Sequence, residues 1–213
     1  AVSKVVHPSG NDEFVIRRRS LKRDARGHPT RQWIRNGVVP IRDQFLRHLV
    51  EAGWKPEQSV GLETREPVKK QVPLMLSEYP SGREYRLDDD DWASVFHGKV
   101  GDFDFFTELP GGTRCVVEWE TGNISSSHRS MNKLCLVLMA GLIDIGVVVL
   151  PSRELYAHLT DRIGNWLELS PYLPLWHHFG QGVKRGMLAV AVVEHDHLTD
   201  DPTIPYITQG NDG

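Results

Sequence analysis

The sequence predicts one α/β domain over residues 1–213, with a central mixed β-sheet flanked by helices. A strand pattern from Val116 to Glu120 runs directly into a helical pattern that extends to Leu142. The apolar run from Ile143 to Leu150 then has the composition of a strand that is buried on both faces. A strand, helix, strand order favours a parallel pair, and turn signals elsewhere predict hairpins, so the sheet should be mixed.

Composition narrows the classes of protein. The chain has 213 residues and a formal net charge of -3, so it lacks the global basic field of many nucleic-acid binders, although local basic stripes can still bind DNA. Its two cysteines, Cys115 and Cys135, lie in apolar segments, which excludes a disulfide framework and indicates a reducing compartment. No apolar run is long enough to span a membrane, and we expect a cytoplasmic protein with no membrane partner.

The amino-terminal region is basic. Between Arg17 and Arg35 there are eight Lys and Arg residues, interrupted by Gly27 and Pro29. Two interpretations stay open: a solvated mobile loop, or a segment that contacts phosphates, for which positive charge is sufficient.

A helix should follow this basic segment. Pro40 suits a first helical turn and Gly53 ends the pattern, while Glu57 in W-K-P-E has by itself the features of a surface acid. The apolar face of the predicted helix consists of Ile41, Phe45, Leu46, Leu49 and Val50.

Residues 61–99 differ from the rest of the chain, and we interpret them as an insertion. Val72 to Tyr79 and Arg83 to Leu87 flank P-S-G, which predicts a β-hairpin. The acidic run from Asp88 to Asp91 follows it, and is more typical of a solvated turn or helix start than of a cation site.

Acidic residues gather on the next predicted hairpin. G-D-F-D-F-F is a short strand, and L-P-G-G turns the chain back into the strand that ends at Glu120. Pairing would bring Asp104 or Asp102 beside Glu118 and Glu120. The spacing D-x(13)-E-x-E is that of a metal-dependent phosphodiesterase, in which cations activate water, whereas the alternative is a solvent-facing strand.

Polar residues mark the beginning of the long helix that follows. Asn123, Ser125, His128, Arg129 and Asn132 supply hydrogen-bonding groups to its first turns.

The carboxyl-terminal third predicts further helices and a strand. Pro151-Ser152 should start a helix that runs through His158, and Thr160 could cap another that begins at Asp161-Arg162. An Asp and an Arg there could read base edges in the major groove or simply form a local ion pair. Met187 to Val193 is a predicted buried strand, and residues 203–213 an extended arm.

Two long stretches resemble a known family. E-W-E-T-G-N-I-S-S-S-H-R-S-M-N-K-L and L-P-S-R-E-L-Y-A-H-L-T-D-R-I-G-N-W-L-E-L-S-P-Y are similar to the BamHI group of type II restriction endonucleases. The shorter N-G-V-V-P-I and I-T-Q-G-N-D-G agree in the same order.

The resemblance implies a PD-(D/E)xK restriction-endonuclease-like fold, here with an inserted hairpin. It implies a homodimer that cuts double-stranded DNA at GGATCC with Mg2+, leaving 5'-phosphate ends, and a DNA methyltransferase that protects the host genome. A DNA-binding protein of the same fold that has lost turnover is the alternative.

The resemblance also implies site residues. Asp104, with Asp102 as its rival, and Glu118 would bind the metal together with Glu57 and the carbonyl of Trp119. Glu120 would help to activate water. The residues that would contact bases are Asn123, Ser125, Arg129, Asp161 and Arg162. Asp212 and Gly213 would lie in an arm that enters the minor groove.

Overall fold

A five-stranded mixed sheet forms the centre of the protein, as the sequence predicts. The computed structural model describes residues 13–61, 74–78, 83–87, 99–160, 162–181, 183 and 185–208. The strand order is β10-β9-β8-β7-β4, with parallel pairs from β10 to β8 and antiparallel pairs from β8 to β4. The strands of this sheet are β4 (Lys55–Gly61), β7 (Lys99–Leu109), β8 (Thr113–Trp119), β9 (Ile145–Pro151) and β10 (Met187–Val193).

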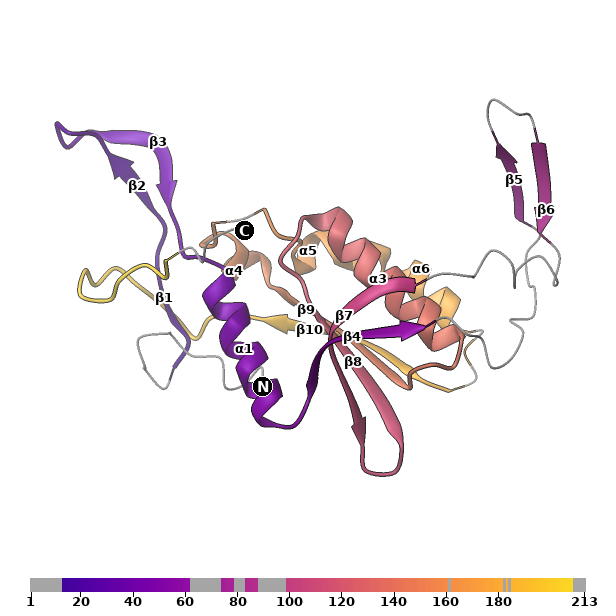
Figure 1. Cartoon of the computed structure of the whole chain (residues 1–213). Coiled ribbons are helices and arrows are strands. Elements are labelled where there is room, and N and C mark those ends of the chain that lie inside the picture. The colour runs from indigo at the N-terminus through magenta and orange to yellow at the C-terminus, as the bar shows by residue number, and fades with distance from the viewer. Residues whose placement is uncertain are drawn as a thin grey trace.

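Helices cover both faces of the sheet (Figure 1). On one face, α1 (Val39–Glu51) and the short α4 (Arg153–Tyr156) pack against Phe105, Val117 and Val149. On the other face, α3 (Ile124–Met139), α5 (Trp166–Leu169) and α6 (Leu173–Gly180) pack against Val116 and Val148. A 3-10 turn, η2 (Ser170–Tyr172), joins α5 to α6. The central strands are therefore buried on both sides, which confirms the prediction from their apolar runs.

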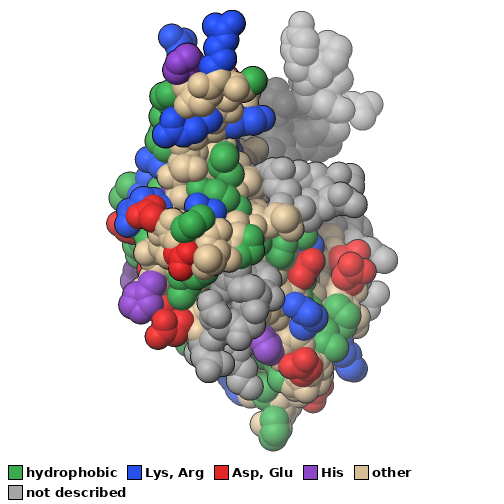
Figure 2. Space-filling model, turned by 90° about the vertical axis from the view of Figure 1, so that its left-hand side faces the viewer, with side chains coloured by type: hydrophobic (Ala, Val, Ile, Leu, Met, Phe, Trp, Pro, Cys, Tyr) green, Lys and Arg blue, Asp and Glu red, His purple; other side chains and the backbone are tan. Residues whose placement is uncertain are grey.

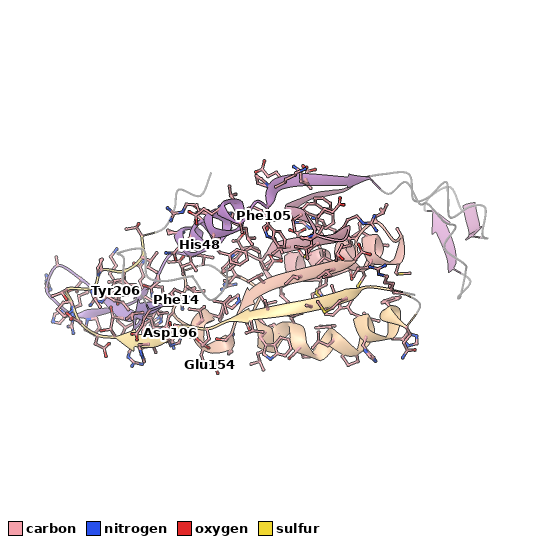
Figure 3. All side chains as sticks on the ribbon, turned by 90° about the horizontal axis from the view of Figure 1, so that it is seen from below. Phe14, His48, Phe105, Glu154, Asp196 and Tyr206 are labelled. Carbon is pink, nitrogen blue, oxygen red and sulfur yellow. The ribbon has the colours of Figure 1, made fainter. Side chains whose placement is uncertain are left out.

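Three two-stranded units accompany the central sheet. β1 (Val15–Arg17) pairs in parallel with β11 (His197–Thr199), which brings distant parts of the chain together. Phe14 and Asp196, linked by a backbone-to-carboxylate hydrogen bond of 2.7 Å, lie at this junction, with Tyr206 near it (Figure 3). β2 (Ser20–Arg23) and β3 (Pro29–Ile34) form an antiparallel hairpin, as do β5 (Leu74–Glu78) and β6 (Arg83–Leu87).

One open interpretation and one local prediction are wrong. Of the two interpretations of the basic segment, the loop is wrong and the phosphate-contacting segment stays a prediction. The segment is a hairpin, because its turn has Gly27 at φ 82° and the Asp24 carboxylate accepts two backbone N–H groups across that turn. No helix begins at Arg162: the next one starts at Trp166 with Asn165 as N-cap. The N–H of Gly164 instead donates to the carbonyl of Gly122, which holds this segment against the start of α3.

Other element boundaries agree with the sequence to within a few residues. α4 has Ser152 as its N-cap, as predicted, but ends at Tyr156 instead of His158. α3 ends at Met139, before Gly141 at φ 65°. In the described part of the chain, no helix has the length and apolar character that crossing a bilayer requires.

Candidate active site and nucleic-acid interface

Three acidic residues lie in a row across adjacent strands. Phe105 of β7 pairs with Val117 of β8 in an antiparallel register, so the residue before Phe105, Asp104, lies opposite the residue after Val117, Glu118. On its other side, the pairs Pro56–Phe105 and Gln58–Phe103 place Glu57 opposite Asp104. Neighbouring strands are about 4.8 Å apart, so the row is compact. The hairpin brings Asp104 beside Glu118, while Asp102 is exposed and its carbonyl is what faces α3.

Burial dominates the electrostatics of Asp104 and Glu118. Desolvation raises the pKa of both carboxyl groups. The charge of Glu57 raises the pKa of Asp104 further, and the charge of Asp104 raises that of Glu118. Hydrogen bonds oppose this shift: Oδ2 of Asp104 accepts the N–H of Trp119 at 2.7 Å. Glu118 is only 6% exposed, so the interpretation of this strand as a solvent face is wrong.

A lysine from α3 neutralises this pair. Nζ of Lys133 lies 2.5 Å from Oε1 of Glu118 and donates to the carbonyl of Asp102 at 2.8 Å. The same ammonium lies 4.5 Å from the centre of the Phe103 ring. Lys133 was not singled out from the sequence; the signal is its place after Ser126 and Ser130, at i, i+4 and i+7 on α3.

Glu120 does not share the surroundings of Asp104 and Glu118. It follows the end of β8, is 3% exposed and turns into the beginning of α3. Its Oε1 accepts the N–H of Gly122 at 2.7 Å, and Oε2 lies 3.4 Å from Oγ of Ser130. Desolvation raises its pKa despite these hydrogen bonds and one from Ser126.

Glu57 combines exposure with a strained backbone. Among the described non-glycine residues, it alone has a positive φ, at 49°. A non-glycine residue in that region costs roughly 1–3 kcal/mol and is found preferentially at functional sites. Its charge raises the pKa of Asp104, which agrees with its place opposite that residue.

The donor set suits a hard divalent cation. Within the described ranges, no three Asp, Glu, His or Cys side chains converge closely enough to enclose a metal ion. Mg2+, however, is usually held by one or two carboxylates together with substrate phosphates and water. The half-buried Asp104 and the buried Glu118 are two adjacent carboxylates of the required kind, and the desolvation of their charges is a cost that a cation would offset.

The predicted base-contacting residues of α3 lie at its exposed beginning. Asn123 is the N-cap, and its side chain accepts the N–H groups of Ser125 and Ser126. Asn123, Ser125 and Arg129 are exposed, and Nη2 of Arg129 lies 3.4 Å from Oγ of Ser126. They occupy the end of the helix that adjoins the acidic strand, because α3 follows β8 after a short turn.

Arg162 is brought to the same region by its own segment. It is exposed, and two residues later the N–H of Gly164 donates to the carbonyl of Gly122 at 2.8 Å. Three predicted site residues, Asp161, Asp212 and Gly213, lie outside the described residues.

Asn36 organises the strands beside this region and was not identified from the sequence. It is fully buried, and Nδ2 donates to the carbonyls of Arg17 and His158 while Oδ1 accepts the N–H of Ile207. Its backbone carbonyl accepts the N–H of Thr160. One side chain thus fixes three segments that are far apart in the sequence.

Comparisons with known proteins agree with this architecture. The profile of the family described as restriction endonuclease BamHI matches residues 1–213. The chain is 33% identical over 213 residues to the type II restriction enzyme OkrAI of Oceanobacter kriegii, covering all of this chain and 84% of that protein. It is also 40% identical over 110 residues to the type II restriction enzyme BamHI of Bacillus amyloliquefaciens, covering 51% of this chain and 52% of the relative.

The mixed sheet carries paired acids on its inner strands β7 and β8. Together with relatives of this kind, this defines the class as a type II restriction enzyme, which is an endonuclease. Within that class, the chain belongs to the BamHI family of restriction endonucleases.

Proposed function

We propose that this enzyme cleaves double-stranded DNA at the palindrome GGATCC by Mg2+-dependent hydrolysis of a phosphodiester, leaving 5'-phosphate ends. The observation that carries the proposal is the adjacent pair of Asp104, half-buried, and Glu118, buried, beside the exposed beginning of α3. The target follows from the resemblance of E-W-E-T-G-N-I-S-S-S-H-R, and of the Asp161-Arg162 segment, to the BamHI group.

The proposed reaction assigns separate tasks to the acids. Asp104, Glu118, Glu57 and the carbonyl of Trp119 would hold Mg2+, which activates water and stabilises the leaving oxygen when bound. Glu120 would help to take the proton from the attacking water. Its raised pKa suits a general base, because such a group works best when its pKa lies near the operating pH.

Base recognition would come from the region around the beginning of α3. Asn123, Ser125 and Arg129 would contact bases from the helix end. Arg162 suits bidentate bonding to guanine and Asp161 suits the cytosine amino group, both in the major groove. Asp212 and Gly213 would enter the minor groove from the 203–213 arm.

A palindromic target favours a homodimer, because a two-fold axis presents the same residues to both half-sites. A cytoplasmic restriction enzyme of this specificity also requires a DNA methyltransferase that modifies GGATCC in the host genome. Both partners are part of the proposal.

Digestion of a plasmid with a single GGATCC site tests the reaction, target and cofactor together. We expect one cut at that site with Mg2+ and none with EDTA, with ends mapped by sequencing. Glu118→Ala should abolish cleavage and keep binding, whereas Glu108→Ala, which removes an exposed acid from the same hairpin, should cut normally. Cleavage retained by Glu118→Ala would contradict the assigned metal ligand.

The second candidate is a protein that binds the target without turnover. The observation that favours it is the contact of Lys133 with Glu118, since that ammonium already occupies one of the carboxylate oxygens. Tight binding to GGATCC in a gel shift, with no Mg2+-dependent cut, would select this function.

A further inference from the structure

The β2–β3 hairpin is the most basic part of the molecule and belongs to none of the assignments above. Eight of the chain's 25 Lys and Arg residues, but only one of its 28 acids, lie between Arg17 and Arg35. The chain as a whole has a net charge of -3, so this positive charge is local. Figure 2 shows Lys and Arg side chains gathered at the free end of the hairpin.

The single acid does not neutralise this charge. Oδ1 of Asp24 accepts the N–H groups of Arg26 and His28 at 2.9 Å each, and Oδ2 lies 3.6 Å from the His28 ring. Asp24 therefore stabilises the turn. No carboxylate of the described residues forms an ion pair with Lys22, Arg26 or Arg31, although Arg18 pairs with Asp200 at the base of the hairpin.

The hairpin has no core of its own. Every residue of β2 is exposed, as are all but one of β3. The ring of Trp33, 46% exposed, is covered in part by the guanidinium of Arg19 at 4.6 Å. A two-stranded ribbon is marginally stable in water, and like charges along it repel one another. A polyanion bound along the hairpin would remove that repulsion.

The base of the hairpin is fixed to the proposed DNA face. The N–H of Arg19 donates to Nδ1 of His158, and Oγ of Ser20 lies 2.7 Å from the hydroxyl of Tyr206. Asn36, directly after β3, holds the carbonyl of His158 and the N–H of Ile207. His158 precedes the Asp161-Arg162 pair, and Ile207 belongs to the carboxyl-terminal arm. The hairpin projects from this junction away from the central sheet (Figure 1).

We propose that the β2–β3 hairpin is an electrostatic arm that binds the phosphate backbone of double-stranded DNA outside the recognition sequence. This inference rests on the proposed function, since it takes the same DNA as ligand. A strand rises about 3.3 Å per residue, so the six residues of β3 span roughly 20 Å. Along the axis of duplex DNA, each strand has one phosphate per about 3.4 Å, so an arm that lies along the axis reaches roughly six base pairs of flanking DNA.

Salt dependence of binding tests the arm. Arg26→Ala/Arg31→Ala removes two exposed charges with no carboxylate partner among the described residues. Arg47→Ala/Arg185→Ala is the control, because it removes two exposed arginines outside the hairpin, of which Arg185 lies 3.8 Å from a carboxylate oxygen of Asp144. Binding is measured in EDTA, from low to physiological salt, on two duplexes that carry GGATCC, one with long flanks and one with almost none.

The arm predicts a specific pattern. Each phosphate contact contributes about 0.9 to the slope of log K against log salt, so the hairpin variant should lose about 1.8 from that slope on the long duplex. The control should lose nothing, and the two variants should bind the short duplex equally. The ratio of target to random affinity should stay unchanged, because backbone contacts carry no sequence information.

An unchanged slope on the long duplex would overturn the arm even if cleavage at GGATCC is normal. The reverse result separates the two proposals. If the protein neither cuts nor prefers GGATCC, but the hairpin variant lowers the slope of log K against log salt on any long duplex, the proposed arm stands and the proposed target is wrong. The proposal would also be wrong if Arg26→Ala/Arg31→Ala lowered the affinity for single-stranded RNA but not for duplex DNA.

Discussion

The ion pair between Lys133 and Glu118 makes the stability of β8 dependent on a residue of α3. Lys133→Met removes the ammonium and keeps a side chain of similar length against Phe103. Removing one partner of a buried ion pair costs about 3–5 kcal/mol, because the other charge stays buried without compensation. The Lys133 and Glu118 side chains are 14% and 8% exposed, so we expect the lower end, about 3 kcal/mol. For a chain of this size, that loss lowers Tm by about 6–12 °C.

Urea unfolding without metal at pH 8 measures this loss. The design is a double-mutant cycle with Glu118→Gln, which removes the carboxylate charge and keeps the shape of the side chain. In the Glu118→Gln background, Lys133→Met should cost below about 1 kcal/mol, because no charge is left unpaired. The loss in the parent should also shrink toward pH 4.5, the unperturbed pKa of a Glu side chain, where a buried Glu118 accepts a proton.

Equal losses in the two backgrounds would refute this reasoning. They would show that Lys133 acts by packing on Phe103 rather than by pairing with Glu118. A loss that does not change with pH would lead to the same conclusion.

Burial and contact lead to four further predictions. The folded pKa of Glu120 is raised above 4.5, so the native state holds the proton of this carboxyl group more tightly than the unfolded state does. The parent should therefore lose stability as pH rises from 4.5 through the folded pKa, and Glu120→Gln should not. Urea unfolding across this pH range measures the difference. Gly164→Ala would place Cβ 2.0 Å from Oγ of Ser127 and should cost about 1–3 kcal/mol in the free energy of unfolding. Asn36→Ala should cost about 3 kcal/mol in the same assay, because its buried partners lose their hydrogen bonds. Arg162→Ala should reduce the free-energy difference between binding to target DNA and binding to random DNA by about 1–3 kcal/mol. An unchanged difference would contradict the proposal that Arg162 binds in the major groove.

Local signals account for the parts of the fold that the sequence predicts well. The α1 helix has Pro in its first turn, apolar residues at helical spacing, and Gly53 at φ 86° after its end. The β10 strand has the predicted bounds, Met187–Val193, because its apolar run is continuous and ends at charged residues. The prediction that it is buried is wrong, because β10 is an edge strand of the sheet and only Val193 is buried. In both segments, local sequence and tertiary packing favour the same structure.

Contacts between distant residues explain what the sequence left open. The choice between Asp104 and Asp102 depends on the register of β7 against β8, which neither residue's neighbours specify. Lys133 and Asn36 were missed because their partners are 15 to 171 residues away along the chain. Thr160 lies in a segment that distant contacts hold in place, since its N–H donates to the carbonyl of Asn36 and the N–H of Gly164 donates to that of Gly122. The next helix therefore begins only at Trp166.

Glu120 gives the fold a direct connection between the acidic strand and the proposed recognition end of α3. Its carboxylate sits at the amino end of that helix, where the N–H of Gly122 and the helix dipole both favour negative charge. The pKa of Glu120 is nevertheless raised, so the cost of burial exceeds these stabilising contacts. A shift of the helix end that moves Gly122 or Ser130 away from this carboxylate would remove stabilisation from its charged form and raise its pKa further.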